Sequence, residues 1–93
     1  MYRIRFFNKA KEYLGKVSFS ERDFILNEIY KLESNPYSHP KMMPLKGYKK
    51  LWKFYIKEHR AIIKILLSGK DIVVLSIGHR RDVYKNFFEK GKK

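Results

Sequence analysis

The sequence predicts an α+β domain in which helices pack on one face of an antiparallel sheet. Residues 8–35 show helical spacing of apolar side chains and helix-capping signals, whereas residues 51–78 hold three successive strand-like runs. Helical and strand patterns are therefore segregated along the chain, which favours the α+β class. A chain of this length supports one modest core, so we expect residues 1–93 to form a single domain.

The first elements are predicted to be a short strand and a short helix. Tyr2–Phe6 alternates polar and apolar residues, as a strand with one buried face does. Asn8 is a residue that favours helix N-caps, and Gly15 one that favours helix ends. We therefore expect a helix from Asn8 to about Leu14.

A second helix is predicted to follow. Ser18–Glu21 matches the capping box, and Ser20–Asp23 matches it in an alternative frame. The helix must end by Asn35, because Pro36 disfavours helical backbone in the residue before it. One stripe of this helix is apolar and carries Phe24, Ile25, Ile29 and Leu32.

The remaining segments outside the strands are a connection and a terminal helix. Residues 36–50 form the connection, with a short extended piece near Met43–Leu45. Asp82 favours capping a short helix over Val83–Lys90, with Val83, Phe87 and Phe88 inward. Gly91–Lys93 is expected to fray. The element order is β-α-α-β-β-β with an optional short C-terminal helix, the last three strands forming an antiparallel meander.

The meander is predicted from Leu51–Lys57, Arg60–Leu67 and Ile72–Gly78. We expect a two-residue connection at Glu58–His59 and a three-residue turn at Gly69–Asp71, because this register sorts polar from apolar side chains best. The apolar face then carries Trp52, Phe54, Ile56, Ala61, Ile63, Ile65, Leu67, Val73, Leu75 and Ile77. The other face carries Lys53, Lys57, Arg60, Lys64, Ser76, Gly78 and Arg80.

The predicted register places like charges opposite each other. Lys57 lies opposite Arg60, Tyr55 opposite Ile62, and Lys53 opposite Lys64. A like-charge cross-strand pair destabilises a sheet by about a few tenths of a kcal/mol. The fold does not need this pair, whereas a polyanionic ligand would explain it.

Charge is the strongest compositional signal. The chain has 22 basic and 9 acidic residues, a net charge of +13, and residues 41–93 hold 15 of the basic and 4 of the acidic ones. Such a field favours nucleic acid, an acidic protein or an anionic membrane as partner, the alternative being a lysine-rich surface of the thermophilic kind. The chain lacks cysteine, a bilayer-length apolar run and a signal-peptide pattern, so a cytoplasmic location is expected.

Three short segments stand out: Leu45–Gly47 before the first hairpin strand, Arg60–Ile63 at the second, and Ile77–Tyr84 at the end. In this order and at this length they resemble the RelE/ParE superfamily of bacterial and archaeal toxins. The resemblance covers the chain from Tyr2 to about Tyr84. It implies a toxin of a type II toxin–antitoxin system, which a cognate antitoxin wraps and neutralises.

RelE-like members of this superfamily are ribosome-dependent endoribonucleases that cleave mRNA in the decoding site and so inhibit translation. Their active face carries a lysine on the first hairpin strand, an arginine at the start of the second, an arginine after the last and a tyrosine soon after. The resemblance therefore implies catalytic roles for Lys53, Arg60, Arg80 and Tyr84. Tyr55 departs from the pattern, since some members have a second lysine there, and so does His79, where some have lysine.

Metal-independent RNA cleavage suits these residues, because the RNA supplies its own 2′-OH nucleophile and no cofactor is needed. Lys53 is the best candidate base, since neighbouring cations favour its neutral form. Arg60 suits phosphate oxygens; Arg80 could do the same or assist the leaving 5′-oxygen. Tyr84 stacks on a base, worth about 1–3 kcal/mol, or packs under the terminal helix. RNA contacts are expected from Lys57, Lys64, Arg81, Tyr55 and His79.

Histidine is the residue type whose side chain changes charge near neutral pH, so His79 is an alternative base, although the counted register turns it to the apolar face. His39, His59 and His79 lack zinc-site spacing, so no metal is predicted.

The alternative functions are inhibition of DNA gyrase without RNA cleavage, as in the ParE branch, and non-catalytic RNA binding. ParE-like members generally lack the four catalytic residues.

Overall fold

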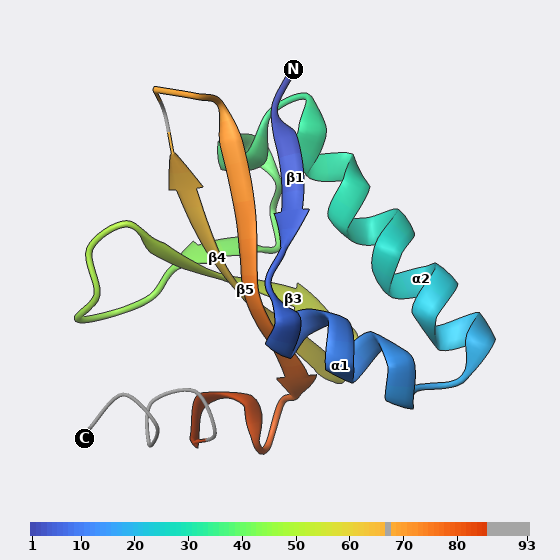
Figure 1. The fold of residues 1–93 in the computed structure, drawn as a ribbon. Helices are drawn as coiled ribbons and strands as arrows, with labels where there is room; N and C mark the ends of the chain where they lie inside the picture. Colours follow the sequence, from blue (N-terminus) through green and yellow to red (C-terminus); the bar gives the residue numbers. More distant parts are fainter. Residues whose placement is uncertain (67, 86–93) are drawn as a thin grey trace.

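The structure, a computed structural model, describes residues 1–66 and 68–85, and it has the predicted α+β class. Figure 1 shows the elements in chain order. They are β1 (Arg3–Phe6), α1 (Asn8–Lys16), α2 (Phe19–Tyr30), short 3-10 turns at Lys31–Glu33 and Pro36–Ser38, β2 (Met42–Pro44), β3 (Leu51–Ile56), β4 (His59–Leu66) and β5 (Asp71–His79).

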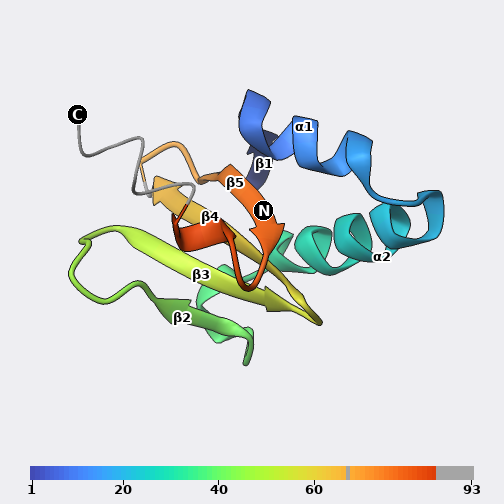
Figure 2. The same cartoon turned by 90° about the horizontal axis from the view of Figure 1, so that it is seen from below.

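The sheet has five strands in the order β1-β5-β4-β3-β2, which can be followed in Figure 2. β3, β4 and β5 form the predicted antiparallel meander at its centre. The prediction of a three-stranded sheet was incomplete, because β1 adds to β5 in parallel and β2 adds to β3 in antiparallel orientation. Asp71 stabilises the parallel edge: Arg3 Nε donates a hydrogen bond to its Oδ1 at 3.1 Å.

The helices differ from prediction in their ends. α1 is preceded by Phe7 as N-cap, which gives no side-chain cap, and it continues through Gly15 to Lys16. α2 begins as predicted, since Ser18 Oγ accepts a hydrogen bond from the Glu21 amide at 3.2 Å. Among the described residues no helix is long and apolar enough to cross a membrane.

The register of β3 against β4 is shifted by two residues from the predicted one. The turn consists of Lys57 and Glu58, where Lys57 takes a φ of 53°, and His59 already belongs to β4. Lys53 therefore lies opposite Ile62 instead of Lys64. A shift of two residues leaves the side chains within both strands on their predicted faces, because strand side chains alternate with period two. The prediction was wrong for Lys57, which lies in the turn and places its ammonium over the Phe24 ring on the helix side.

A β-bulge in the pairing of β4 with β5 overturns part of the predicted face assignment. The register shifts between Ile62 and Ile63, so that Ile62 pairs with Ser76 and Ile63 with Val74, leaving Leu75 as the extra residue. Beyond a bulge the alternation of faces is inverted. The prediction that Val73 and Leu75 join the core face was therefore wrong, whereas Ile77 does join it.

The main core lies between the sheet and both helices, which lie together on one side of it (Figure 1). It contains Ala10, Leu14, Ile25, Ile29, Leu32, Met42, Phe54, Ile56, Ala61, Ile63, Ile65, Ile72, Val74 and Ile77.

A second, smaller cluster, here called the outer cluster, consists of Leu45, Ile62 and Val83, with Leu51, Leu75 and Tyr84 against it. Residues 83–85 are helical. The rest of the predicted Val83–Lys90 helix, the tail and Leu67 lie outside the described residues.

Candidate functional site

A tyrosine on β3 lies between two basic side chains. Tyr55 pairs directly with Arg60 on β4, and the Arg60 guanidinium carbon lies 4.0 Å from the centroid of the Tyr55 ring. The Lys53 ammonium lies 5.8 Å from the same centroid. This is within the range of cation–π attraction. The ring thus positions both cations on the outer face of the sheet, the face opposite the helices.

The Arg60 guanidinium is held at one nitrogen and open at the others. Nη1 donates hydrogen bonds to the carbonyl oxygens of Lys57 at 2.6 Å and His59 at 2.8 Å. An arginine has five N–H donors, and within the described part of the chain Nε and Nη2 have no acceptor. The open edge presents the fork of donors that matches phosphate or carboxylate oxygens.

Tyr84 joins this pair from the C-terminal turn. Burial raises the pKa of its phenol, as does nearby Tyr55, while Arg60 opposes the rise. The turn is anchored by Val83, which is buried against β5 beside Gly78: a Cβ at position 78 would lie 3.0 Å from the Val83 Cβ. The glycine therefore lets the turn approach the sheet and place Tyr84 near Arg60.

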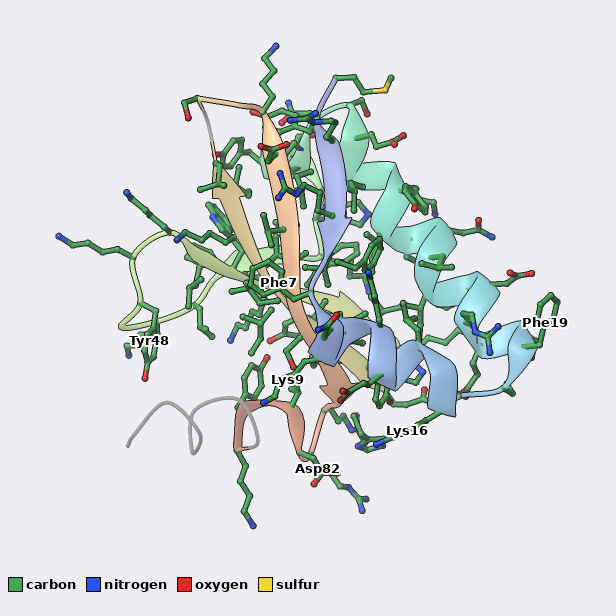
Figure 3. All side chains as sticks on the ribbon, viewed as in Figure 1. Phe7, Lys9, Lys16, Phe19, Tyr48 and Asp82 are labelled. Atoms are coloured by element: carbon green, nitrogen blue, oxygen red, sulfur yellow. The ribbon has the colours of Figure 1, made fainter. Side chains whose placement is uncertain are left out.

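Arg80 and Arg81 lie exposed in the turn after β5, next to the β3–β4 turn. The Arg80 amide donates to the Glu58 carbonyl at 2.8 Å, and the Arg81 amide donates to His79 Nδ1 at 3.2 Å. Asp82 lies at the tip of this turn, as Figure 3 shows. His79 pairs with the buried His59, so it lies on the helix side of the sheet, as the counted register predicts.

Two of the predicted RNA-contacting lysines lie apart from this group. The Lys57 ammonium lies 4.1 Å from the centroid of the Phe24 ring on α2, on the helix side. Lys64 pairs with Leu51 and Val73, four residues from Arg60 along β4, which is a separation of about 13 Å. The structure therefore brings together Lys53, Tyr55, Arg60 and Tyr84, with Arg80 and Arg81 in the adjoining turn.

A second polar group, which the sequence analysis missed, lies on the helix side. His59 is buried and its Nδ1 lies 2.8 Å from the Tyr13 hydroxyl oxygen. Burial, with Glu21 and Glu58, raises the pKa of Tyr13. The pKa of Glu58 is lowered, chiefly by a hydrogen bond from its own backbone amide; desolvation opposes this as the next-largest effect, and His59, His79 and Lys57 lower the pKa further. The predicted Glu58–His59 turn concealed this group, because it left His59 outside the strand.

Comparison with known proteins identifies relatives of the whole fold. Residues 4–84 match the sequence model of the family described as "ParE toxin of type II toxin-antitoxin system, parDE". No curated protein sequence matches the chain.

Three solved structures with similar folds are toxins or toxin–antitoxin complexes. The archaeal RelE–RelB complex from Pyrococcus horikoshii OT3 has a chain that is 20% identical, with a TM-score of 0.74, covering 87% of this chain and 97% of that one. A chain of the intact Escherichia coli RelBE complex is 16% identical, with a TM-score of 0.73, covering 85% of this chain and 96% of that one. The YoeB/ParE toxin from Agrobacterium tumefaciens is 19% identical, with a TM-score of 0.69, covering 83% of this chain and 96% of that one.

Proposed function

We propose, since the chain belongs to the ParE toxin family of type II toxin–antitoxin systems, that this toxin is a ribosome-dependent endoribonuclease that cleaves mRNA in the decoding site. The observation that supports this most is the open edge of the Arg60 guanidinium, set beside Lys53, Tyr55 and Tyr84 on one face. These groups supply a base, an anion-binding fork and an aromatic surface, which are the parts that RNA cleavage needs.

In the proposed reaction the 2′-oxygen of the RNA attacks the adjacent phosphorus and the 5′-oxygen leaves. Lys53, as the general base, takes the proton from the 2′-OH, and the departing 5′-oxygen takes up a proton from water, so the products are a 2′,3′-cyclic phosphate and a 5′-hydroxyl. Arg60 donates to the phosphorane oxygens, where negative charge accumulates. Arg80 binds the phosphate or assists the departing 5′-oxygen. Tyr55 and Tyr84 provide ring faces for a base.

The proposed dependence on the ribosome is supported by the composition of this group. Among the described residues of the outer face, no histidine or carboxylate is paired with a second acid–base residue. His79 and Glu58 lie on the helix side of the sheet instead. A strongly cationic face without such a pair needs a substrate that is already ordered. Messenger RNA held in the decoding site meets that need.

The proposed partner is a cognate antitoxin in the cytoplasm. The solved complexes to which the chain is similar contain RelB antitoxins. An antitoxin for this chain should lay an amphipathic segment on the sheet and place carboxylates near Arg60 and Arg80, because these cations face solvent beside the outer cluster.

Cell-free translation with mapping of mRNA 3′ ends tests the proposal. We expect the added protein to produce new ends inside decoding-site codons, and Arg80→Ala to remove most of them. Arg5→Ala is the matched control, because Arg5 lies on β1 near Asp71, at the opposite edge of the sheet from β3. Intact mRNA at inhibitory protein concentrations would exclude the nuclease.

The second candidate function is gyrase inhibition, which the ParE name of the matching family favours. A supercoiling assay separates the two. Inhibited supercoiling with intact mRNA supports the ParE-like function, and binding of RNA without either effect supports a non-catalytic RNA-binding protein.

A further inference from the structure

A nitrogen of a buried histidine faces a small cleft behind the β3–β4 turn. His59 is only 4% exposed, and its Nδ1 is engaged by the Tyr13 hydroxyl at 2.8 Å. Nε2 points the other way, toward a cleft of about 350 Å³. The cleft is lined by Ser20, Glu21, Phe24, Lys57, Glu58 and His59.

Two carboxylates approach this nitrogen without bonding to it. Nε2 lies 3.9 Å from Glu21 Oε1 and 3.9 Å from Glu58 Oε2, beyond hydrogen-bond distance. The side chains of Glu21 and Glu58 are 45% and 44% exposed, so both can rotate. Three acceptor atoms thus converge on one point, and His59 lacks a hydrogen-bond partner at Nε2 among the described residues.

The spacing suits a small metal ion. The three candidate ligand atoms all lie within 4.8 Å of one another. A tetrahedral Zn²⁺ site has bonds of about 2.0–2.2 Å, which places neighbouring ligand atoms about 3.4 Å apart. The two distances from His59 therefore need to shorten by about 0.5 Å, and the distance between the two carboxylates, at most 4.8 Å, by up to about 1.4 Å; rotation of the two half-exposed glutamates provides this.

Tyr13 supplies the support that a metal-binding histidine requires. With the hydrogen on Nδ1, His59 donates to the Tyr13 oxygen and keeps the Nε2 lone pair for a metal. Histidine ligands are generally held in this way by an acceptor on their second nitrogen. The competing cation in the cleft is Lys57, whose ammonium lies over the Phe24 ring at 4.1 Å. Within the described chain, neither glutamate has a lysine or arginine within ion-pair distance.

We propose that Glu21, Glu58 and His59 bind one Zn²⁺ ion, with water as the fourth ligand, and so join the start of α2 to the β3–β4 turn. An imidazole ligand favours a borderline transition metal over Mg²⁺ and Ca²⁺, which prefer oxygen ligands alone. The bound ion acts structurally. It fixes the turn whose carbonyls hold Arg60 and the Arg80 amide.

The test is a zinc titration of the untagged full-length protein after treatment with a chelator. Calorimetry should show one Zn²⁺ per chain, and the melting temperature should rise with Zn²⁺ but not with Mg²⁺. Glu21→Gln and Glu58→Gln should each weaken binding about tenfold or more, since each removes a charged ligand. Glu12→Gln, an exposed glutamate on α1, is the matched control and should bind like the parent.

Tyr13→Phe tests the positioning role separately. Every ligand is kept, but the acceptor for Nδ1 is lost, so zinc affinity should fall about tenfold to a hundredfold. Each glutamine variant should lose the zinc-dependent rise in melting temperature, measured against its own metal-free melting temperature. The proposal is overturned if the parent shows no stoichiometric binding, or if both glutamine variants bind zinc as the parent does. RNA takes no part in these measurements, so their failure leaves the nuclease proposal untouched.

Discussion

Replacing Arg60 separates its structural contribution from its proposed role in cleavage. Arg60→Ala removes a cation–π contact with Tyr55, worth about 0.5–1 kcal/mol at an exposed site. It also removes two charge-assisted hydrogen bonds from Nη1, each about 1.5–3 kcal/mol when buried and less here, because Arg60 is half-buried. We expect the free energy of unfolding to fall by about 1–3 kcal/mol in total.

The expected effect of this variant on cleavage is larger than its effect on stability. Losing a positioned donor to a developing oxyanion lowers a rate about 10²- to 10³-fold. Arg60→Lys keeps the charge but lacks the planar fork, so its rate should fall between those of the parent and Arg60→Ala. The assay is the rate of appearance of mapped mRNA 3′ ends in cell-free translation, with urea unfolding measured in parallel and Arg5→Ala as control.

The reasoning is refuted if folded Arg60→Ala protein cuts mRNA as fast as the parent. Equal rates for Arg60→Lys and the parent would refute the narrower idea that the guanidinium geometry matters. Loss of cutting together with loss of folding would be resolved by Tyr55→Leu. This variant removes the ring contact with Arg60 but keeps the guanidinium, and so should cut at a rate well above that of Arg60→Ala.

Three other outcomes are expected. Lys53→Ala should remove most cleavage of mRNA in the same assay, whereas Lys57→Ala should retain it, because Lys57 lies against a ring on the helix side. The pKa of the Tyr84 phenol is raised in the folded chain, so above about pH 10 the unfolded chain loses this proton before the folded chain does. The free energy of unfolding should therefore fall as the pH rises, and urea unfolding of Tyr84→Phe should show a smaller fall. Gly78→Ala, whose Cβ would lie 3.0 Å from a valine of the C-terminal turn, should destabilise by about 1–3 kcal/mol, while Gly15→Ala, with open space around it, should stabilise by about 0.5–1 kcal/mol.

Within a regular stretch of strand, alternation is enough to predict which face a side chain occupies, but not which residue it faces. Lys53, Tyr55 and Arg60 were assigned to the outer face correctly, because a shift of two residues preserves alternation. The cross-strand partners predicted for these residues were wrong, because the same two-residue shift changes which residues lie opposite each other. In the observed register His59 belongs to β4 and is buried against Tyr13, a contact between β4 and α1 that no local pattern reveals.

The bulge and the parallel edge were also beyond local patterns. β5 is apolar along most of its length, so either face assignment of Val73 and Leu75 satisfies its sequence. β1 joins β5 in parallel through long-range pairing that a short alternating run does not specify. The group proposed as metal ligands could not be predicted from the sequence, because Glu21 comes from α2 and the other two from the hairpin. A search for ligand spacing within a sequence motif detects only sites whose ligands lie close together in the sequence.

These irregular features together create the outer face that the proposed function needs. The two-residue shift places Tyr55 opposite Arg60, so that ring and guanidinium can stack. The bulge turns Leu75 outward into the outer cluster, which packs Val83 and so brings Tyr84 to the same place. Without these irregularities the sheet would carry the same charges but would lack the packing site that holds the C-terminal tyrosine. The arrangement of cations and aromatic rings therefore depends on a small apolar cluster in their midst, as expected where a sheet departs from regularity at a functional surface.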